Sequence, residues 1–313
     1  LALVALADVV VENFSARAMP SMGLGYAALR RANEKIIYVS MPGYGMSGPY
    51  RDRVAFGPTV EPLSGLTQML GYSPEEPRNS AMALMDPIAA TQAAAAVTDA
   101  LMQRAETGEG CLIEMSLHEG GVTYSAPWLV DEQLGQRPQC MGNRHPAMAP
   151  HGIYPSKGED CWVAIACKND EQWRALCNLI GHPEKSNLAL SERIEQHDEI
   201  DDMICAWSLI RTNQEATALL QDYTIAAGPV NNAADITEDQ QVRARQFFVT
   251  FERFNTPIPG HSIQMGGIQR NTWTRCPDLG EHNREVLRAW LNYEDDVIRA
   301  LERDAVIFSA PPT

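Results

Sequence analysis

Met85-Asp86-Pro87-Ile88-Ala89-Ala90 opens an alanine-rich run that continues to Arg104. Asp followed by Pro is typical of a helix start, because Asp accepts bonds from unpaired N–H groups at the N-cap and Pro fits the first helical position. Alanine side chains are small, so neighbouring segments can approach such a helix closely on several sides. We therefore predict a helix that has Asp86 as its N-cap and lies deep in a large domain.

Asp86 is also a candidate for chemistry. The first turn of a helix favours a carboxylate, typically by ~0.3–1 kcal/mol, whereas burial favours the neutral acid. Taken alone, this local sequence is explained by a plain helix cap. The rest of the chain has to decide whether Asp86 does more.

Strand-like and helix-like segments alternate on both sides of this run. Apolar segments at residues 8–14 and 35–40 flank a helical pattern at 26–33, and a further apolar segment at 111–116 follows the alanine-rich helix. This order is typical of βαβ units. It predicts an α/β fold with a parallel sheet.

Proline and glycine become frequent after residue 125, which indicates a long connection. We predict a large first domain over residues 1–125, a linker over 126–150, and a small α+β domain over 151–230 with a helix at 170–180. Residues 231–313 should form a second linker and C-terminal helices, one at 283–291 and one from Glu294, that return to the large domain.

Composition excludes several classes of function. The net charge of −15 argues against nucleic acid or an anionic membrane as partner. No apolar segment reaches the ~20 residues that span a bilayer. The seven cysteines include no C-x-x-C pair, so we predict no metal site and expect a reducing, cytoplasmic location.

Charge is unevenly distributed along the chain. Residues 1–53 hold six basic and four acidic residues, a net charge of +2, and the remainder carries −17. A basic segment on an acidic protein suits a small polyanionic ligand, although an ordinary scatter of surface charge explains it equally well.

Gly43-Tyr44-Gly45-Met46-Ser47-Gly48 has the spacing of a dinucleotide-binding loop after a predicted strand. That fingerprint must open a helix, whereas Pro49-Tyr50-Arg51-Asp52-Arg53 follows here. Ser47 does not stand in G-x-S-x-G either, so no nucleophile elbow is present. We interpret the glycines as positions where backbone approaches a ligand closely.

Several segments, in this order along the chain, resemble the CaiB/BaiF family, the class III CoA-transferases. They are Ala7-Asp8-Val9-Val10-Val11-Glu12-Asn13-Phe14, Met22-Gly23-Leu24-Gly25-Tyr26, the run from Gly43 to Arg53, Asp86 with its helix, Thr107-Gly108-Glu109-Gly110, Met141-Gly142-Asn143-Arg144-His145-Pro146, Gly228-Pro229-Val230 and Leu279-Gly280-Glu281-His282. The resemblance implies that Asp86 is a catalytic nucleophile.

The same resemblance implies a Rossmann-like large domain, an inserted smaller domain and an interlocked homodimer. The family's first strand, first helix and N-terminal active-site segment have no counterpart here, so we expect residues to be missing before Leu1. The family also has a Gly-rich closing loop in one branch that has no counterpart here. Residues at the family's CoA-contacting positions are Asn13, Phe14, Met22, Gly43, Tyr44, Gly45, Arg51 and Arg53. Ser15, Ala16 and Ser21 depart from the family pattern beside them.

The implied activity is transfer of CoA from an acyl-CoA to a carboxylic acid acceptor, with no tightly bound cofactor. Asp86 would form a mixed anhydride and then an aspartyl-CoA thioester, and backbone N–H groups of residues 43–48 would stabilise the oxyanions. The family's racemase branch is an alternative, but it uses a His in the preceding loop, and residues 55–61 hold none. A catalytically inactive CoA-binding relic is the other alternative.

Overall fold

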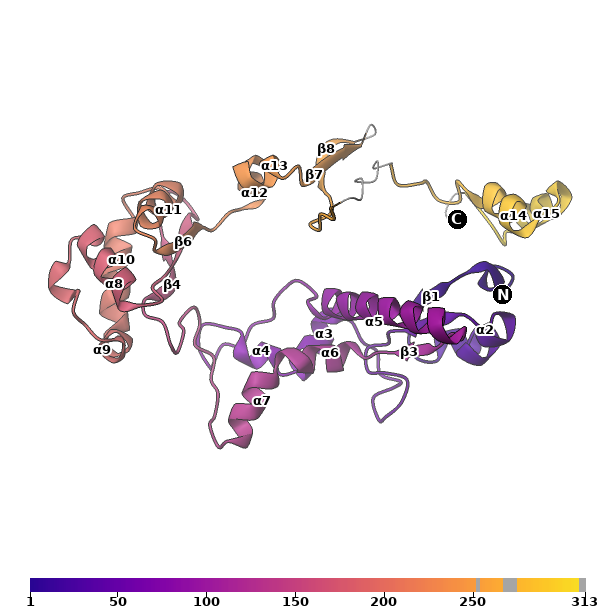
Figure 1. Ribbon diagram of the computed structural model, residues 1–313, viewed down its shortest axis with the longest axis horizontal. Coiled ribbons are helices and arrows are strands. Elements are labelled where there is room, and N and C mark those ends of the chain that lie inside the picture. The colour runs from indigo at the N-terminus through magenta and orange to yellow at the C-terminus, as the bar shows by residue number, and fades with distance from the viewer. Residues whose placement is uncertain (252–253, 267–274, 310–313) are drawn as a thin grey trace. The chain divides into compact units, whose positions relative to one another are not determined.

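The computed structural model describes residues 1–251, 254–266 and 275–309 of the chain. The chain divides into two units, Leu1–Gly142 with Asp278–Thr313 and, between these segments, Asn143–Pro277 (Figure 1). The first unit contains a parallel sheet and the second an antiparallel one. The predicted α/β class is therefore confirmed.

Strand β2 (Ile37–Ser40) is the buried middle strand of the parallel sheet, between β1 (Val9–Glu12) and β3 (Leu112–Glu114). Successive side chains of a strand point to opposite faces. Ile37 and Val39 accordingly pack against the alanines of helix α5, and Tyr38 packs with the helices on the other face. Side chains of this strand thus pack on both faces of the sheet, which lies between two layers of helices.

Helices cover both faces of this sheet. The 3₁₀ turn η1 (Val4–Leu6) precedes β1, and the helices of the first unit are α1 (Ala18–Ser21), α2 (Tyr26–Ala32), α3 (Gly57–Leu63), α4 (Leu66–Met69), α5 (Met85–Thr107), α6 (Leu117–Tyr124), α7 (Ala126–Gln133), α14 (Asn283–Leu291) and α15 (Asp295–Arg303). The long helix α5 contacts β2, and it lies alongside the sheet in Figure 1.

Helix α5 differs from the prediction in two ways. Its N-cap is Leu84, so Asp86 is the second helical residue and makes no cap bond. Ala93 and Ala100 are buried against the sheet, whereas Ala94 is exposed, so one face of the helix is buried. The helix starts earlier because Met85 is fully buried together with Ile88 one turn later, and tertiary packing overrides the local Asp-Pro signal.

Residues 126–150, predicted as a linker, begin with helix α7. Pro127 stands in the first turn of α7, where its missing N–H leaves no bond unmade. A proline that favours a helix start was thus interpreted as a loop signal.

The second unit packs helices on one sheet. The strands β4 (His151–Pro155), β5 (Trp162–Ala166) and β6 (Ala226–Pro229) pair antiparallel, and the helical segments are α8 (Asp170–Ile180), η2 (Pro183–Lys185), α9 (Leu190–Glu195), α10 (His197–Ser208), α11 (Asn213–Asp222), α12 (Ala233–Glu238) and α13 (Gln240–Ala244). Its core contains Trp173 of α8, Ile204 of α10 and Leu220 of α11.

A two-stranded sheet of β7 (Phe248–Phe251) and β8 (Phe254–Pro259) lies in the predicted second linker. Residues 252–253 and 267–274 of that linker lie outside the described residues. The domain bounds proposed from the sequence stay a prediction.

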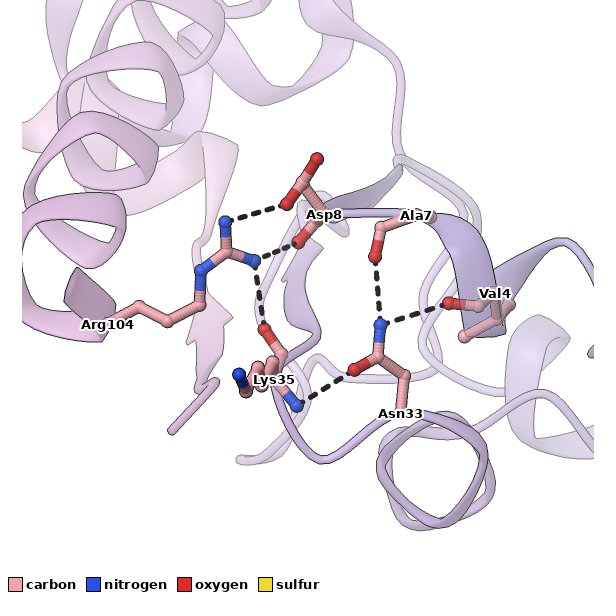
Figure 2. A network of polar contacts seen from close by, with 6 residues as sticks. All are labelled: Val4, Ala7, Asp8, Asn33, Lys35 and Arg104. Carbon is pink, nitrogen blue, oxygen red and sulfur yellow. Dashed lines mark hydrogen bonds and ion pairs between the residues drawn. The ribbon is translucent and has the colours of Figure 1, made fainter. Parts of the chain in front are cut away.

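Arg104, in the last turn of α5, ties this helix to the amino ends of two strands (Figure 2). Its Nη1 donates to the carbonyls of Asp8, 3.2 Å away, and Lys35, 3.1 Å away, and its Nη2 pairs with the Asp8 carboxylate at 2.8 Å. Asn33 extends the network by donating to the carbonyls of Val4 and Ala7. The planar guanidinium reaches three acceptors at once, which an ammonium group matches poorly.

We predict that Arg104→Lys lowers the free energy of unfolding by about 1–2 kcal/mol, because the two carbonyls lose a shared donor. Urea unfolding of the variant measures this. Arg31→Lys, at an exposed position of α2, is the control and should change stability by less than about 0.5 kcal/mol. Equal stability of the two variants would contradict the structural role of Arg104.

Candidate active site

The carboxyl ends of the three parallel strands meet at one edge of the sheet. Glu12 of β1 pairs with Ser40 of β2, and Ser40 pairs with Glu114 of β3. Ligands of open α/β sheets bind beyond this edge. Asn13 and Phe14 follow β1 directly, and the glycine loop, residues 43–48, follows β2, so the structure places both predicted CoA-binding segments here.

Glu12 is a buried carboxylate that shapes the first of these segments. Its Oε2 accepts the Phe14 N–H at 2.9 Å, and its Oε1 accepts the hydroxyls of Tyr38, at 3.0 Å, and Ser40. Burial, followed by the charge of Glu12, raises the pKa of Tyr38. Tyr38 therefore stays a hydrogen-bond donor, and Glu12 fixes the turn that exposes Asn13 and Phe14.

The glycine loop is held by the end of β3 and by the residues that follow this strand. Glu114 accepts the Met46 N–H at 2.6 Å, and the Gly43 carbonyl accepts the His118 N–H at 3.0 Å and the Ser116 hydroxyl at 3.3 Å. These contacts join residues about seventy positions apart in the sequence. They give the loop a defined shape before any ligand is bound.

Glycine is required in this loop by the protein's own packing. A Cβ on Gly43 would lie 2.1 Å from the Cβ of Ala55, and Gly45 has a φ of +82° that side chains other than glycine rarely adopt. We expected these glycines to let a ligand approach the backbone. For Gly43 the structure gives a second reason, because a side chain there would collide with Ala55.

A hollow of about 420 Å³ opens beside the loop. Its lining comes from two segments, the loop with its next residues, and the chain from the end of β3 to the start of α6: Tyr44, Gly45, Ser47, Gly48, Pro49, Tyr50, Glu114, Met115, Ser116, His118 and Glu119. The Nε2 of His118 donates to the Leu63 carbonyl at 3.1 Å, which orients the imidazole. The hollow therefore lies at the carboxyl ends of the parallel strands, where ligands of such sheets bind.

The two arginines predicted to bind CoA, Arg51 and Arg53, lie in different surroundings. Arg51 is exposed, and the Arg53 guanidinium lies over the Tyr50 ring, 3.7 Å from its centroid. Asp52 between them pairs with Arg17, at the start of α1. This pair links the end of the loop to the segment after β1.

Met22 is exposed directly after α1. In the described part of the chain, no hydrogen bond joins Met22 to the glycine loop. The structure thus brings Asn13, Phe14 and the loop to one sheet edge, and the Met22 N–H donates to the carbonyl of Ala18 in α1.

Asp86 carries an exposed carboxylate in the first turn of α5. Its Oδ2 lies against Gly57, the first residue of α3, where a Cβ would approach to 2.5 Å. Leu84 and Met85, just before Asp86, pack in the same apolar cluster as Tyr44 of the glycine loop. The predicted nucleophile and the predicted CoA loop are therefore joined through this cluster.

The buried thiols and the other ionisable groups offer no metal centre in the described residues. Groups of three or more His, Cys, Asp or Glu side chains placed to hold a metal ion are absent there. Burial raises the pKa of Cys167 and of Cys177 to about 12, so both are inert core residues. None of the described helices combines the length and apolar character of a membrane span.

Two buried acids at this site were missed by the sequence analysis, Glu12 and Glu61. Glu12 ends an apolar strand and Glu61 interrupts the apolar residues of α3, and a charge in such a position is the signal that could have indicated them. Both accept bonds from loop backbone.

Comparison with known proteins agrees with this geometry. Residues 1–283 match the sequence profile of CoA-transferase family III. The chain belongs to CoA-transferase family III. It is 30% identical to the succinyl-CoA–D-citramalate CoA-transferase of Chloroflexus aurantiacus over 97% of this chain and 78% of that protein, and 30% identical to the succinate–glutarate CoA-transferase of Agrobacterium fabrum over 91% and 73%.

The structure of a CaiB/BaiF family protein from Brucella suis superposes with a TM-score of 0.84, at 28% identity, over 92% of this chain and 77% of that one. The predicted family and fold are therefore confirmed. As a class III CoA-transferase, the protein is an enzyme that uses CoA thioesters as substrates.

We predict that Tyr38→Phe lowers the free energy of unfolding of this CoA-transferase by about 1–3 kcal/mol, because buried Glu12 loses a donor. Tyr26→Phe is the matched control, since the Tyr26 ring stacks on Tyr38 at 6.2 Å and the substitution keeps that ring. Denaturant unfolding compares the two variants. A larger loss for Tyr26→Phe than for Tyr38→Phe would contradict this assignment.

Proposed function

We propose that this class III CoA-transferase moves CoA to a carboxylic acid through covalent intermediates on Asp86. The observation that carries the proposal is the exposed Asp86 carboxylate, in the first turn of α5, whose neighbours Leu84 and Met85 pack with Tyr44 of the glycine loop. A first-turn position favours a negative charge, and the carboxylate is accessible to a thioester.

The transfer balances in four steps. An Asp86 oxygen attacks the acyl-CoA carbonyl, and the C–S bond breaks to give a mixed anhydride and CoA thiolate. The thiolate attacks the carbonyl carbon of Asp86, which releases the donor acid and leaves an aspartyl-CoA thioester. The acceptor carboxylate then attacks this thioester, and the released thiolate finally attacks the acceptor's carbonyl, which regenerates Asp86.

Each tetrahedral intermediate carries an oxyanion that needs donors. The Met46 N–H is engaged by Glu114, so we assign the oxyanion role to other backbone N–H groups of residues 43–48. The loop's contacts to Glu114, Ser116 and His118 support this, because a donor held in place needs no reorganisation during the reaction.

The remaining site residues are assigned to CoA. Asn13 and Phe14 at the end of β1 and Gly43, Tyr44 and Gly45 after β2 share the sheet edge, and we propose that they contact CoA. We assign Met22 to the same ligand, and Arg51 and Arg53 to its phosphates. A homodimer and a cytoplasmic location also stay proposals.

The relatives' names support a substrate class. The transferases of Chloroflexus aurantiacus and Agrobacterium fabrum are named for succinyl-CoA with D-citramalate and for succinate with glutarate. We infer that the donor here is the CoA thioester of a small dicarboxylic acid and that the acceptor is a second one.

Asp86→Asn should reduce CoA transfer from succinyl-CoA to glutarate to background, because an amide cannot form the anhydride. The fold should survive, with about 0.3–1 kcal/mol lost, since Asp86 makes no cap bond. Asp99→Asn, an exposed residue of the same helix, is the control and should keep the wild-type rate. The assay follows thioester exchange in the natural full-length protein.

Two outcomes would overturn this assignment. Transfer by Asp86→Asn at the wild-type rate would leave Asp86 as a structural residue. Deuterium uptake from D₂O at the acyl α-carbon without CoA transfer would indicate the racemase reaction instead.

CoA affinity should fall as salt rises, because Arg51 and Arg53 face a polyanion. Arg51→Ala and Arg53→Ala should each raise the Kd for CoA about threefold to tenfold and reduce its salt dependence. Calorimetry measures both, with Arg299→Ala on α15 as an exposed control. If the Kd for CoA changes neither with salt nor with either loop substitution, the assignment of Arg51 and Arg53 to the phosphates is contradicted.

A further inference from the structure

Glu61 of α3 is an acidic residue that is almost wholly buried, with 1% of its surface exposed. Its Oε1 accepts the Ser80 N–H at 2.7 Å, and its Oε2 accepts the Ser80 hydroxyl at 2.6 Å. One serine therefore satisfies both oxygens. A buried carboxylate is costly unless it is hydrogen-bonded, so this pairing is strongly specified.

The same helix face that carries Glu61 also touches Asp86. Gly57 and Glu61 stand four residues apart on α3, and residues at this spacing share a face. Gly57 lies against the Asp86 Oδ2, and Glu61 holds Ser80 one turn later. Helix α3 thus contacts both ends of the segment that leads into α5.

The segment between these two contacts is held in an unusual conformation. Ala81 and Ala83 have φ angles of +59° and +46°, in the left-handed region that alanine rarely adopts. Such residues persist only where the surroundings determine them. Ser80 directly precedes them, and the Asp86 N–H donates to the Ala83 carbonyl at 3.0 Å.

A second contact fixes the beginning of the segment. Asn79 donates to the Pro58 carbonyl of α3 at 3.1 Å, and its Oδ1 accepts the Thr67 hydroxyl at 2.6 Å. Asn79 and Ser80 are therefore both anchored just before the left-handed residues. Since the segment can move only by breaking these bonds, they determine how Asp86 approaches Gly57.

We propose that Glu61 is a positioning residue of the reaction. By accepting both hydrogen bonds from Ser80 it holds the segment in which Ala81 and Ala83 are left-handed, and so keeps the Asp86 carboxylate beside Gly57, aimed at the thioester. This inference rests on the proposed role of Asp86 as nucleophile. Glu61 itself touches no substrate and acts through Asp86.

Positioning of this kind affects the chemical step more than substrate binding. A displacement of about 1 Å in a reacting group can cost on the order of 10²-fold in rate. The groups assigned to CoA lie on other segments, after β1 and β2. The loss of Glu61 should therefore lower kcat and leave the KM for acyl-CoA nearly unchanged.

Four variants of the full-length enzyme test the proposal. Glu61→Ala should lower kcat by on the order of 10²-fold, and Ser80→Ala, which keeps the backbone bond, by roughly tenfold. Glu61→Gln should stay within about threefold of wild type, because its carbonyl accepts the Ser80 N–H and its amide can donate to the hydroxyl. Glu106→Ala, at an exposed position on α5, is the control.

Hydrogen–deuterium exchange supplies a readout that does not depend on turnover. The peptide covering residues 79–86 should exchange faster in Glu61→Ala than in wild type and at the wild-type rate in Glu61→Gln. Unchanged kcat in Glu61→Ala, or a kcat loss without faster exchange, would overturn the proposal. If Glu61→Ala fails to fold, Ser80→Ala decides by the same two measurements.

The two single variants separate this inference from the proposed function. Transfer at background in Asp86→Asn together with wild-type kcat in Glu61→Ala would overturn the positioning role of Glu61 and leave the role of Asp86 in place. Full activity of Asp86→Asn by itself would instead overturn the role of Asp86.

Discussion

The burial of Met85 fixes the place where α5 begins. Its side chain is fully buried with Val60 and Ile88, and a methyl group on Gly121 of α6 would lie 2.4 Å from its sulfur. Burial of a methionine side chain stabilises a fold by roughly 1.5–3 kcal/mol. Successive helical residues are 100° apart, so with Met85 turned inward Asp86 leaves the core toward α3. The position of the carboxylate thus follows from an apolar contact one residue away.

Two buried acids act on the loops around this point in the same way. Glu12 accepts the backbone N–H of Phe14, and Glu61 accepts that of Ser80. In each case a carboxylate on a regular element holds the first residues of an irregular segment, where charge-assisted bonds are strong. Residues on regular elements thereby fix the conformation of the loops. One of these loops carries the residues assigned to CoA binding, and the other leads to Asp86.

Elements with strong local signals could be predicted from the sequence. The helix predicted at residues 170–180 is α8. Its ends were predictable because Asn169 caps its start and Gly181 takes the left-handed conformation after its end. The helix predicted at residues 283–291 is α14. The order of strands and helices also indicated the parallel sheet, since alternation follows from the chain itself.

Features that depend on distant contacts could not be predicted. Asp86 was expected to be the N-cap, yet the N-cap is Leu84, because the burial of Met85 places the helix start two residues earlier. The bond between Glu61 and Ser80 spans nineteen positions, and that between Met46 and Glu114 spans sixty-eight. No local pattern encodes such pairs. The family resemblance predicted Asp86 as the nucleophile, and the structure shows the contacts that hold the segment before it.

The central claim is that Asp86 is the covalent nucleophile, and oxygen transfer from the acceptor tests it most directly. The four steps leave one acceptor oxygen on the Asp86 carboxylate after each turnover. With succinyl-CoA and glutarate labelled with ¹⁸O in its carboxylates, mass spectrometry of the peptide holding Asp86 should therefore show an increase of about 2 Da for each oxygen exchanged, assigned to Asp86 by fragmentation. Turnover with no mass increase on that peptide, or with the label on another residue, would contradict the account.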